Sequence, residues 1–203
     1  MKSVIFEDKK DWYAGRLGKI TGSRLKDVLD KTRGTGKKIG FYELIAERLG
    51  IPADDEDERE RGNRLEPVAI KMFEAETGET VDTSLVIWMR DDNESIAISP
   101  DGHYNEYEDA VEAKCLASAR HIEAYLTKKI PAEYIKQGIQ YFVVNDKCQR
   151  VHFTFYDPRL LAKPFFIITL HRADLQTEII ETLAAERDVL SEVTLIVNEL
   201  SNF

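Results

Sequence analysis

The sequence has few of the residues that define several common protein classes. Among its 203 residues are two cysteines, Cys115 and Cys148, and four scattered histidines, and neither type occurs at the spacing of a metal-binding motif. The chain has no apolar run near the roughly eighteen residues of a membrane span, and residues 1–8 are too short and too soon acidic for a signal peptide. A disulfide framework and a cysteine- or histidine-based metal site are therefore excluded, and we expect a reduced, cytoplasmic compartment.

The composition is that of a soluble globular protein, with 43% hydrophobic and 32% charged residues. The length is enough for one sizeable α/β domain with a real core, and no repeat or low-complexity linker divides it. We expect a single domain over residues 1–203. Its parts would be a basic helical region (1–50), a catalytic core (about 60–171) and a closing helix (about 173–200).

Negative charge is in excess overall, at −9, but basic residues gather near the N-terminus. Residues 16–38 hold eight lysines and arginines against two aspartates, whereas residues 54–60 hold six acids and one arginine. A basic segment in an otherwise acidic protein is typical of a protein that binds a polyanion in one channel. The alternative is that the basic residues form an ordinary solvated helix face.

Hydrophobic periodicity predicts a mixed α/β fold, in which helices flank a central mixed β-sheet. The acidic stretch 54–60 is predicted to be a loop or the start of the next helix. Predicted helices are 41–49, 65–77, 117–128, 131–144 and 174–200, and predicted strands are 85–89, 96–99, 110–115, 151–156 and 165–170.

Two carboxylates and a lysine follow predicted strands in the segment from Ser99-Pro100-Asp101-Gly102 to Glu112-Ala113-Lys114. Because strand side chains alternate, Glu112 and Lys114 share a face and Ala113 points away. If the strands before Asp101 and Glu112 pair as a hairpin, Asp101 reaches the same face. Paired carboxylates repel unless a cation lies between them, and oxygen ligands suit Mg²⁺ or Mn²⁺. The pattern predicts a phosphodiester-cleaving site.

A simpler interpretation remains open for the same residues. Glu112 and Lys114 would form an ordinary ion pair, and Asp101 would be a turn residue before Gly102. Cys115, beside Lys114, is predicted to be a small buried side chain rather than a nucleophile.

Three further motifs accompany this segment in a fixed order. Arg16-x-Gly18-x-x-Thr21-x-Ser23 comes first, Gly62-x-x-x-Glu66 second, and Tyr134-Ile135-Lys136-Gln137 last, with Gln137 and Tyr141 forming a Gln-x-x-x-Tyr pair. Together they resemble the phage-type alkaline exonucleases, the lambda exonuclease and YqaJ-like viral recombinase family. The resemblance covers about residues 12–156 and implies the PD-(D/E)XK restriction-endonuclease-like fold.

The resemblance also implies roles for individual residues. Asp101, Glu112 and the backbone carbonyl of Ala113 would bind two Mg²⁺ ions, with Mn²⁺ as a substitute, and Glu66 would complete the acidic cluster. Lys114 would position the attacking water. The residues expected to bind the 5′-terminal phosphate are Arg16, Ser23, Ser99 and Gln137, and Arg33 is expected to contact DNA.

Structural alternatives stand beside three of these roles. Ser23 would only cap its helix, Gln137 would be a buried polar residue, and Glu66 would be a capping-box acid that answers Asn63.

For the whole protein, the resemblance implies 5′→3′ digestion of one strand of linear duplex DNA to mononucleotides. It also implies a ring-shaped homotrimer and a phage single-strand annealing protein as partner. The alternatives are an endonuclease of the same fold, or a non-catalytic module that binds DNA ends. The complete set Glu66, Asp101, Glu112 and Lys114 argues against the inert module.

Overall fold

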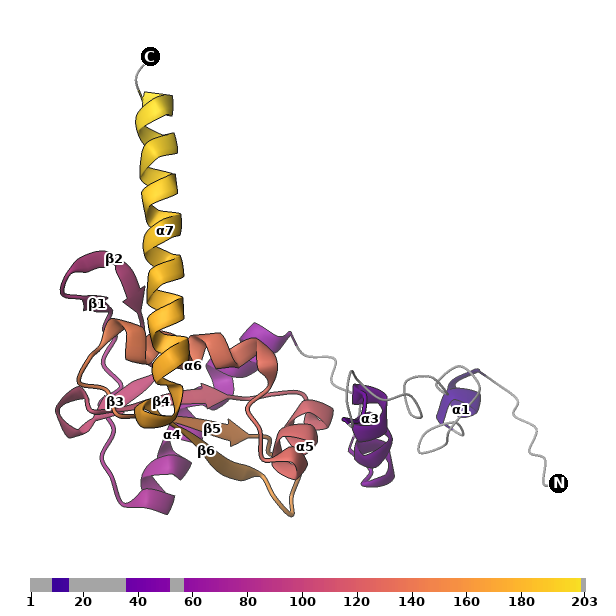
Figure 1. Ribbon diagram of the computed structural model, residues 1–203. Helices are drawn as coiled ribbons and strands as arrows, with labels where there is room; N and C mark the ends of the chain where they lie inside the picture. Colours follow the sequence, from indigo (N-terminus) through magenta and orange to yellow (C-terminus); the bar gives the residue numbers. More distant parts are fainter. Residues whose placement is uncertain (1–8, 15–35, 52–56, 202–203) are drawn as a thin grey trace.

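The computed structural model describes residues 9–14, 36–51 and 57–201, and Figure 1 shows their arrangement. The helices are α1 (Lys9–Ala14), α3 (Ile39–Arg48), α4 (Glu58–Thr77), α5 (Ser118–Thr127), α6 (Ala132–Val144) and α7 (Gln176–Ser201), with short 3₁₀ turns at Asn105–Tyr107 and Arg172–Leu175. The strands are β1 (Trp88–Arg90), β2 (Asn93–Ile98), β3 (Gly102–Tyr104), β4 (Asp109–Lys114), β5 (Arg150–Tyr156) and β6 (Phe165–His171).

The central sheet is mixed, as predicted, with the strand order β3-β4-β5-β6. β4 pairs antiparallel with β3 and parallel with β5, and β5 pairs antiparallel with β6. The parallel pair needs a long crossover connection, and α5 and α6 provide it. Helices therefore flank a mixed sheet, which confirms the predicted fold class.

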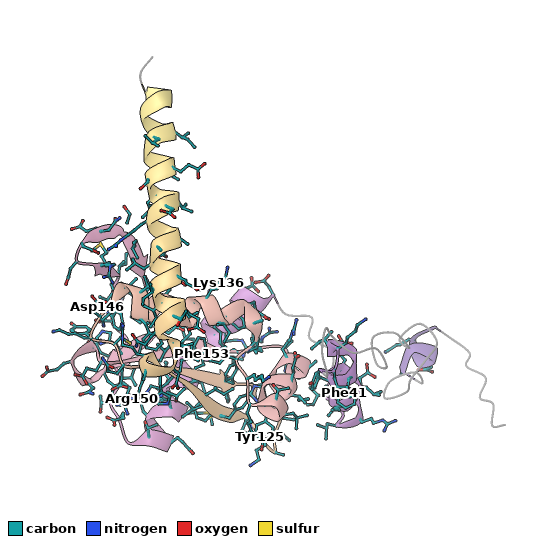
Figure 2. The ribbon with its side chains drawn as sticks, in the orientation of Figure 1. Phe41, Tyr125, Lys136, Asp146, Arg150 and Phe153 are labelled. Carbon is teal, nitrogen blue, oxygen red and sulfur yellow. The ribbon has the colours of Figure 1, made fainter. Side chains whose placement is uncertain are left out.

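The two faces of β4 contact different helices. Val111 packs with Ile70 and Phe73 of α4, and Ala113 lies against the same helix. Ala110 of the opposite face packs with apolar residues of α6 and with Phe153 of β5, which lies deep among the side chains in Figure 2. This alternation directs Glu112 and Lys114 toward α6 and confirms that Ala113 points away from them.

The strand predicted at 96–99 does not pair with β4. It forms β2, which pairs with β1 in a separate two-stranded sheet, and the short strand β3 takes the predicted place beside β4. Pro100 has no N–H to donate to a ladder, so it interrupts the chain between β2 and β3. A side chain at Gly102 would meet Val81 Cγ1 at 2.4 Å, so glycine is needed where β3 passes that segment.

α4 starts earlier than predicted. Its helical residues begin at Glu58, so Pro67 lies in the interior rather than in the first turn. Lacking an N–H, Pro67 cannot donate the helical hydrogen bond to the carbonyl of Asn63. This start makes Asn63 an interior residue, so the prediction of a capping box between Asn63 and Glu66 is wrong. The acidic residues Glu58 and Glu60 belong to the helix, while residues 52–56 lie outside the described residues.

The remaining predicted helices are confirmed. α3 ends before Gly50, and its Tyr42 and Ala46 pack with Ile122 of α5. α7 extends well beyond the sheet in Figure 1. In the described ranges, no helix has the length and apolar character needed to cross a membrane.

A buried histidine makes stability depend on pH. His121 of α5 is fully buried, and its Nε2 lies 3.0 Å from the carbonyl oxygen of Lys163, which assigns the proton to Nε2. Within the described residues, its Nδ1 is buried without a hydrogen-bond partner. Burial lowers the pKa of His121 below its ordinary value, so the unfolded chain takes up this proton more readily.

We therefore expect the stabilising contribution of neutral His121 to be complete above about pH 6.5 and to be lost as the pH falls toward the folded pKa of His121. The slope should approach about 1.4 kcal/mol per pH unit for this group. Urea unfolding from pH 7.5 to 5 would measure it, and His121→Gln should have a shallower slope. The slope that remains would combine His152, whose pKa burial also lowers, with an opposing contribution from Asp101, whose pKa burial raises to about 7. An unchanged slope in His121→Gln would contradict the assignment.

Candidate active site

The end of β4 brings Asp101, Glu112 and Lys114 together. Gly102 pairs with Val111, so Asp101 lies one residue beyond the ladder, opposite Glu112. Its Oδ2 accepts a hydrogen bond of 2.8 Å from the backbone N–H of Ala113. Asp101 and Glu112 therefore lie at the same strand ends, as predicted. The strand that brings Asp101 there is β3, and not the strand predicted at 96–99.

Glu112 is the centre of the site and is only 2% exposed. Its Oε1 accepts hydrogen bonds of 2.7 Å from Lys114 Nζ and of 2.7 Å from Gln137 Nε2. Its Oε2 accepts a hydrogen bond from the Tyr141 hydroxyl. Burying a carboxylate is costly unless donors replace the lost water, and these three donors fix its orientation.

Lys114 is held from α6 as well as from its own strand. Besides Glu112, its Nζ donates to Gln137 Oε1 at 3.0 Å and lies 4.5 Å from the centroid of the Tyr134 ring. Tyr134, Gln137 and Tyr141 are spaced i, i+3 and i+7, which places them on one face of α6. One helix face therefore contacts both members of the Glu112–Lys114 pair.

Asp101 and Glu66 both have raised pKa values in the site. Burial raises the pKa of Asp101 to about 7, the charges of Glu112 and Glu66 add to the effect, and the Ala113 N–H and Lys114 oppose it. Burial and the charge of Glu112 also raise the pKa of Glu66 on α4, against Lys114. Three carboxylates from different elements thus share one electrostatic environment, which a cation would stabilise.

The residues present fit a divalent cation by charge and by donor type. Mg²⁺ is held by one or two carboxylates together with waters and substrate phosphates, and Asp101 and Glu112 supply such a pair. In the described part of the chain, no group of three His, Cys, Asp or Glu side chains is close enough together to hold a metal ion. The role of Glu66 in completing the acidic cluster, directly or through water, therefore stays a prediction.

Two of the four residues predicted to bind the terminal phosphate, Ser99 and Gln137, lie in the described part of the chain. Ser99 is exposed after β2, and Gln137 is engaged with Glu112 and Lys114. Gln137 is therefore half-buried and hydrogen-bonded to both Glu112 and Lys114. This environment resembles the alternative in which Gln137 is a buried polar residue. Arg16, Ser23 and Arg33 lie outside the described residues.

Cys115 is buried, as predicted, among Leu65 and Ala69 of α4. Burial raises the pKa of its thiol to about 12, which disfavours the thiolate that a nucleophile needs.

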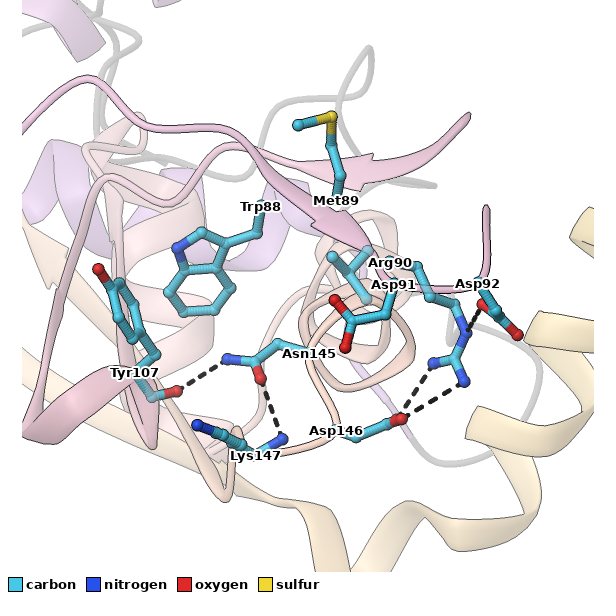
Figure 3. A pocket seen from close by; sticks show the side chains of 10 residues that line it. Trp88, Met89, Arg90, Asp91, Asp92, Tyr107, Asn145, Asp146 and Lys147 are labelled. Atoms are coloured by element: carbon cyan, nitrogen blue, oxygen red, sulfur yellow. Dashed lines mark hydrogen bonds and ion pairs between the residues drawn. The ribbon is translucent and has the colours of Figure 1, made fainter. Parts of the chain in front are cut away.

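A separate hollow of about 540 Å³ lies at the other end of β4 (Figure 3). Arg90 forms ion pairs there with Asp92 at 2.8 Å and with Asp146 at 3.1 Å. Asn145 closes the opposite wall with a 2.9 Å hydrogen bond to the Tyr107 carbonyl oxygen. This arrangement leaves the Glu112–Lys114 network as the candidate site.

Sequence reasoning gave no role to two residues of this network, Tyr134 and Tyr141. Both belong to the sequence motifs around Gln137, and their helical spacing from Gln137 is the signal that the sequence offers. Only the docking of α6 on the sheet shows which charged groups they contact.

A mixed sheet flanked by helices, with an Asp and a Glu-x-Lys at adjoining strand ends, defines a nuclease of the PD-(D/E)XK fold. Residues 11–147 match the model of the YqaJ-like viral recombinase domain, and the chain belongs to this family.

Solved structures agree with the family. The crystal structure of an alkaline exonuclease, LHK-Exo, from Laribacter hongkongensis is similar with a TM-score of 0.61 and 29% identity, covering 95% of this chain and 98% of that one. The structure of LHK-Exo in complex with dAMP gives a TM-score of 0.53 and 31% identity, covering 93% and 100%. No curated protein sequence gives a significant match.

Proposed function

We propose that the chain is a metal-dependent 5′→3′ exonuclease. It degrades one strand of linear duplex DNA from 5′-phosphorylated ends to mononucleotides and leaves a 3′ overhang for recombination by strand annealing. Membership of the family and the likeness to an alkaline exonuclease support a DNA exonuclease. The observation that carries the proposal is the Asp101–Glu112–Lys114 cluster at the end of β4.

Asp101 and Glu112 would hold the divalent cation, helped by the Ala113 carbonyl and by Glu66 through water. The cation supplies Lewis-acid stabilisation of phosphate oxygens and a more acidic bound water. Lys114 places its ammonium beside the carboxylates, where it orients the attacking water and stabilises the negative charge that develops on it. Gln137 holds Lys114 and Glu112 in their relative positions.

The preference for a 5′-phosphorylated end would come from Arg16, Ser23, Ser99 and Gln137, with Arg33 on the DNA. A guanidinium with hydroxyl and amide donors suits a doubly charged terminal phosphate. The bound dAMP of LHK-Exo is a mononucleotide, the class of product that such a digestion releases. A homotrimer that encircles DNA, and a phage annealing protein as partner, complete the proposal.

The test compares linear duplex DNA, with and without 5′-phosphates, and a covalently closed circle, each in Mg²⁺ or EDTA. We expect mononucleotides from the phosphorylated linear DNA in Mg²⁺ alone, with the circle intact. Cutting of the circle would replace the exonuclease by an endonuclease, and end binding without hydrolysis would indicate an inert module. Equal rates on both kinds of linear end would remove the phosphate pocket from the proposal.

A further inference from the structure

Tyr134 contacts the site lysine with the face of its ring. Lys114 Nζ lies 4.5 Å from the centroid of this ring, within the range of a cation–π interaction. The Lys114 side chain is only 14% exposed. Because such interactions strengthen when the cation is shielded from water, this contact is worth more than one on an open surface.

The ring is a third contact of the ammonium, beside its two hydrogen-bond partners. Glu112 and Gln137 accept hydrogen bonds from Nζ at 2.7 and 3.0 Å, and both lie toward the sheet–α6 interface. A lysine has a long flexible stem and a compact charge, so two oxygen partners leave it freedom to swing. A half-buried ring on the rigid helix α6 restricts that movement.

We propose that Tyr134 is a positioning residue, which holds Lys114 in the orientation needed to act on the attacking water. The proposal rests on the nuclease function proposed above. The aromatic face is the active feature, whereas the hydroxyl is dispensable. The ring acts through Lys114 and does not itself touch the scissile phosphate.

The chain offers a matched control for this contact. Lys128 Nζ lies 3.7 Å from the ring centroid of Tyr125 on α5, a second cation–π pair that does not include Glu112 or Lys114. Tyr125→Leu removes the same kind of interaction elsewhere, and melting curves of each variant show that it folds.

In steady-state digestion of 5′-phosphorylated linear duplex, we expect Tyr134→Leu to lower kcat about tenfold with little change in KM. Tyr134→Phe should retain kcat within about twofold, because the ring face is preserved. Tyr125→Leu should match the wild type. An equal loss in Tyr134→Phe and Tyr134→Leu would assign the effect to the hydroxyl and overturn the proposal, as would wild-type turnover in Tyr134→Leu.

A second readout does not depend on nuclease activity. With ¹³C-labelled lysine, the Lys114 ε-methylene signal, identified by its loss in Lys114→Arg, should be shifted by the ring current of Tyr134. The shift should persist in Tyr134→Phe and vanish in Tyr134→Leu. If it is absent from the wild type, the contact does not exist. If it is present but the wild type cleaves no DNA, the proposed function fails while the contact stands.

Discussion

Lys114→Met should lower the turnover of linear duplex DNA by about 10²–10³-fold, the usual effect of removing one charge-stabilising group from a reaction site. Methionine keeps much of the volume of the stem, so the packing beside Gln137 and Tyr134 changes little. The ammonium that contacts Glu112 Oε1 at 2.7 Å is lost, and with it the charge that stabilises a developing hydroxide. DNA binding should persist, because the contacts expected to hold the DNA lie elsewhere.

The control for this rate measurement is a variant that removes one lysine charge far from the Glu112–Lys114 network. Lys147→Met provides it, since Lys147 is exposed in the hollow at the opposite end of β4. Its turnover should equal that of the wild type. Near wild-type turnover in Lys114→Met would remove Lys114 from the reaction, and loss of DNA binding in that variant would make it a binding residue instead.

Asp109→Ala should destabilise the fold by about 2–3 kcal/mol, as expected when the hydrogen bonds to a buried charged group are lost. Asp109 is 0% exposed, and its carboxylate accepts hydrogen bonds from Arg150 at 2.5 and 2.8 Å, and from Asn105 at 3.0 Å. Burial raises the pKa of Asp109, but the hydrogen bonds from Arg150 and Asn105 outweigh it and hold this pKa below its ordinary value. Alanine removes this partner from Arg150, whose side chain is 45% exposed at the start of β5.

For a chain of this length, that loss corresponds to a melting temperature lower by about 5–10 °C. Asp146→Ala is the matched control, because Asp146 pairs with Arg90 while 74% exposed, and such pairs contribute about 1 kcal/mol or less. The folded fraction of Asp109→Ala should still cleave DNA, which would separate this structural carboxylate from Glu112 on the same strand. A melting temperature unchanged from the wild type would contradict the ion pair's structural role.

The extents of the regular elements were largely predictable from sequence. The apolar periodicity of residues 117–128 and 131–144 is carried by neighbouring side chains, so α5 and α6 lie where it predicts them. Pro67 and Pro100 mark the limits of that reasoning. A proline was expected to stay in the first turn of a helix, whereas α4 extends nine residues ahead of Pro67. The break at Pro100 decided that the 96–99 strand pairs with β1 and not with β4.

The site was predictable where it depends on strand alternation. Glu112 and Lys114 share a face because side chains alternate along any strand, and the structure confirms it. Asp101 meets them through β3, which has only three residues and no periodicity that a sequence could show.

The amino-acid sequence by itself therefore determined the acidic and basic residues of the site, their order and the face of β4 that carries two of them. Only the tertiary structure decided that α6 lies over this face, so that Gln137 bridges Glu112 and Lys114 and Tyr134 contacts the lysine. The physical reason is that alternation and helical period are local properties of the chain. Contacts between residues twenty or more positions apart depend on how apolar faces pack into one core, and no local pattern encodes that packing.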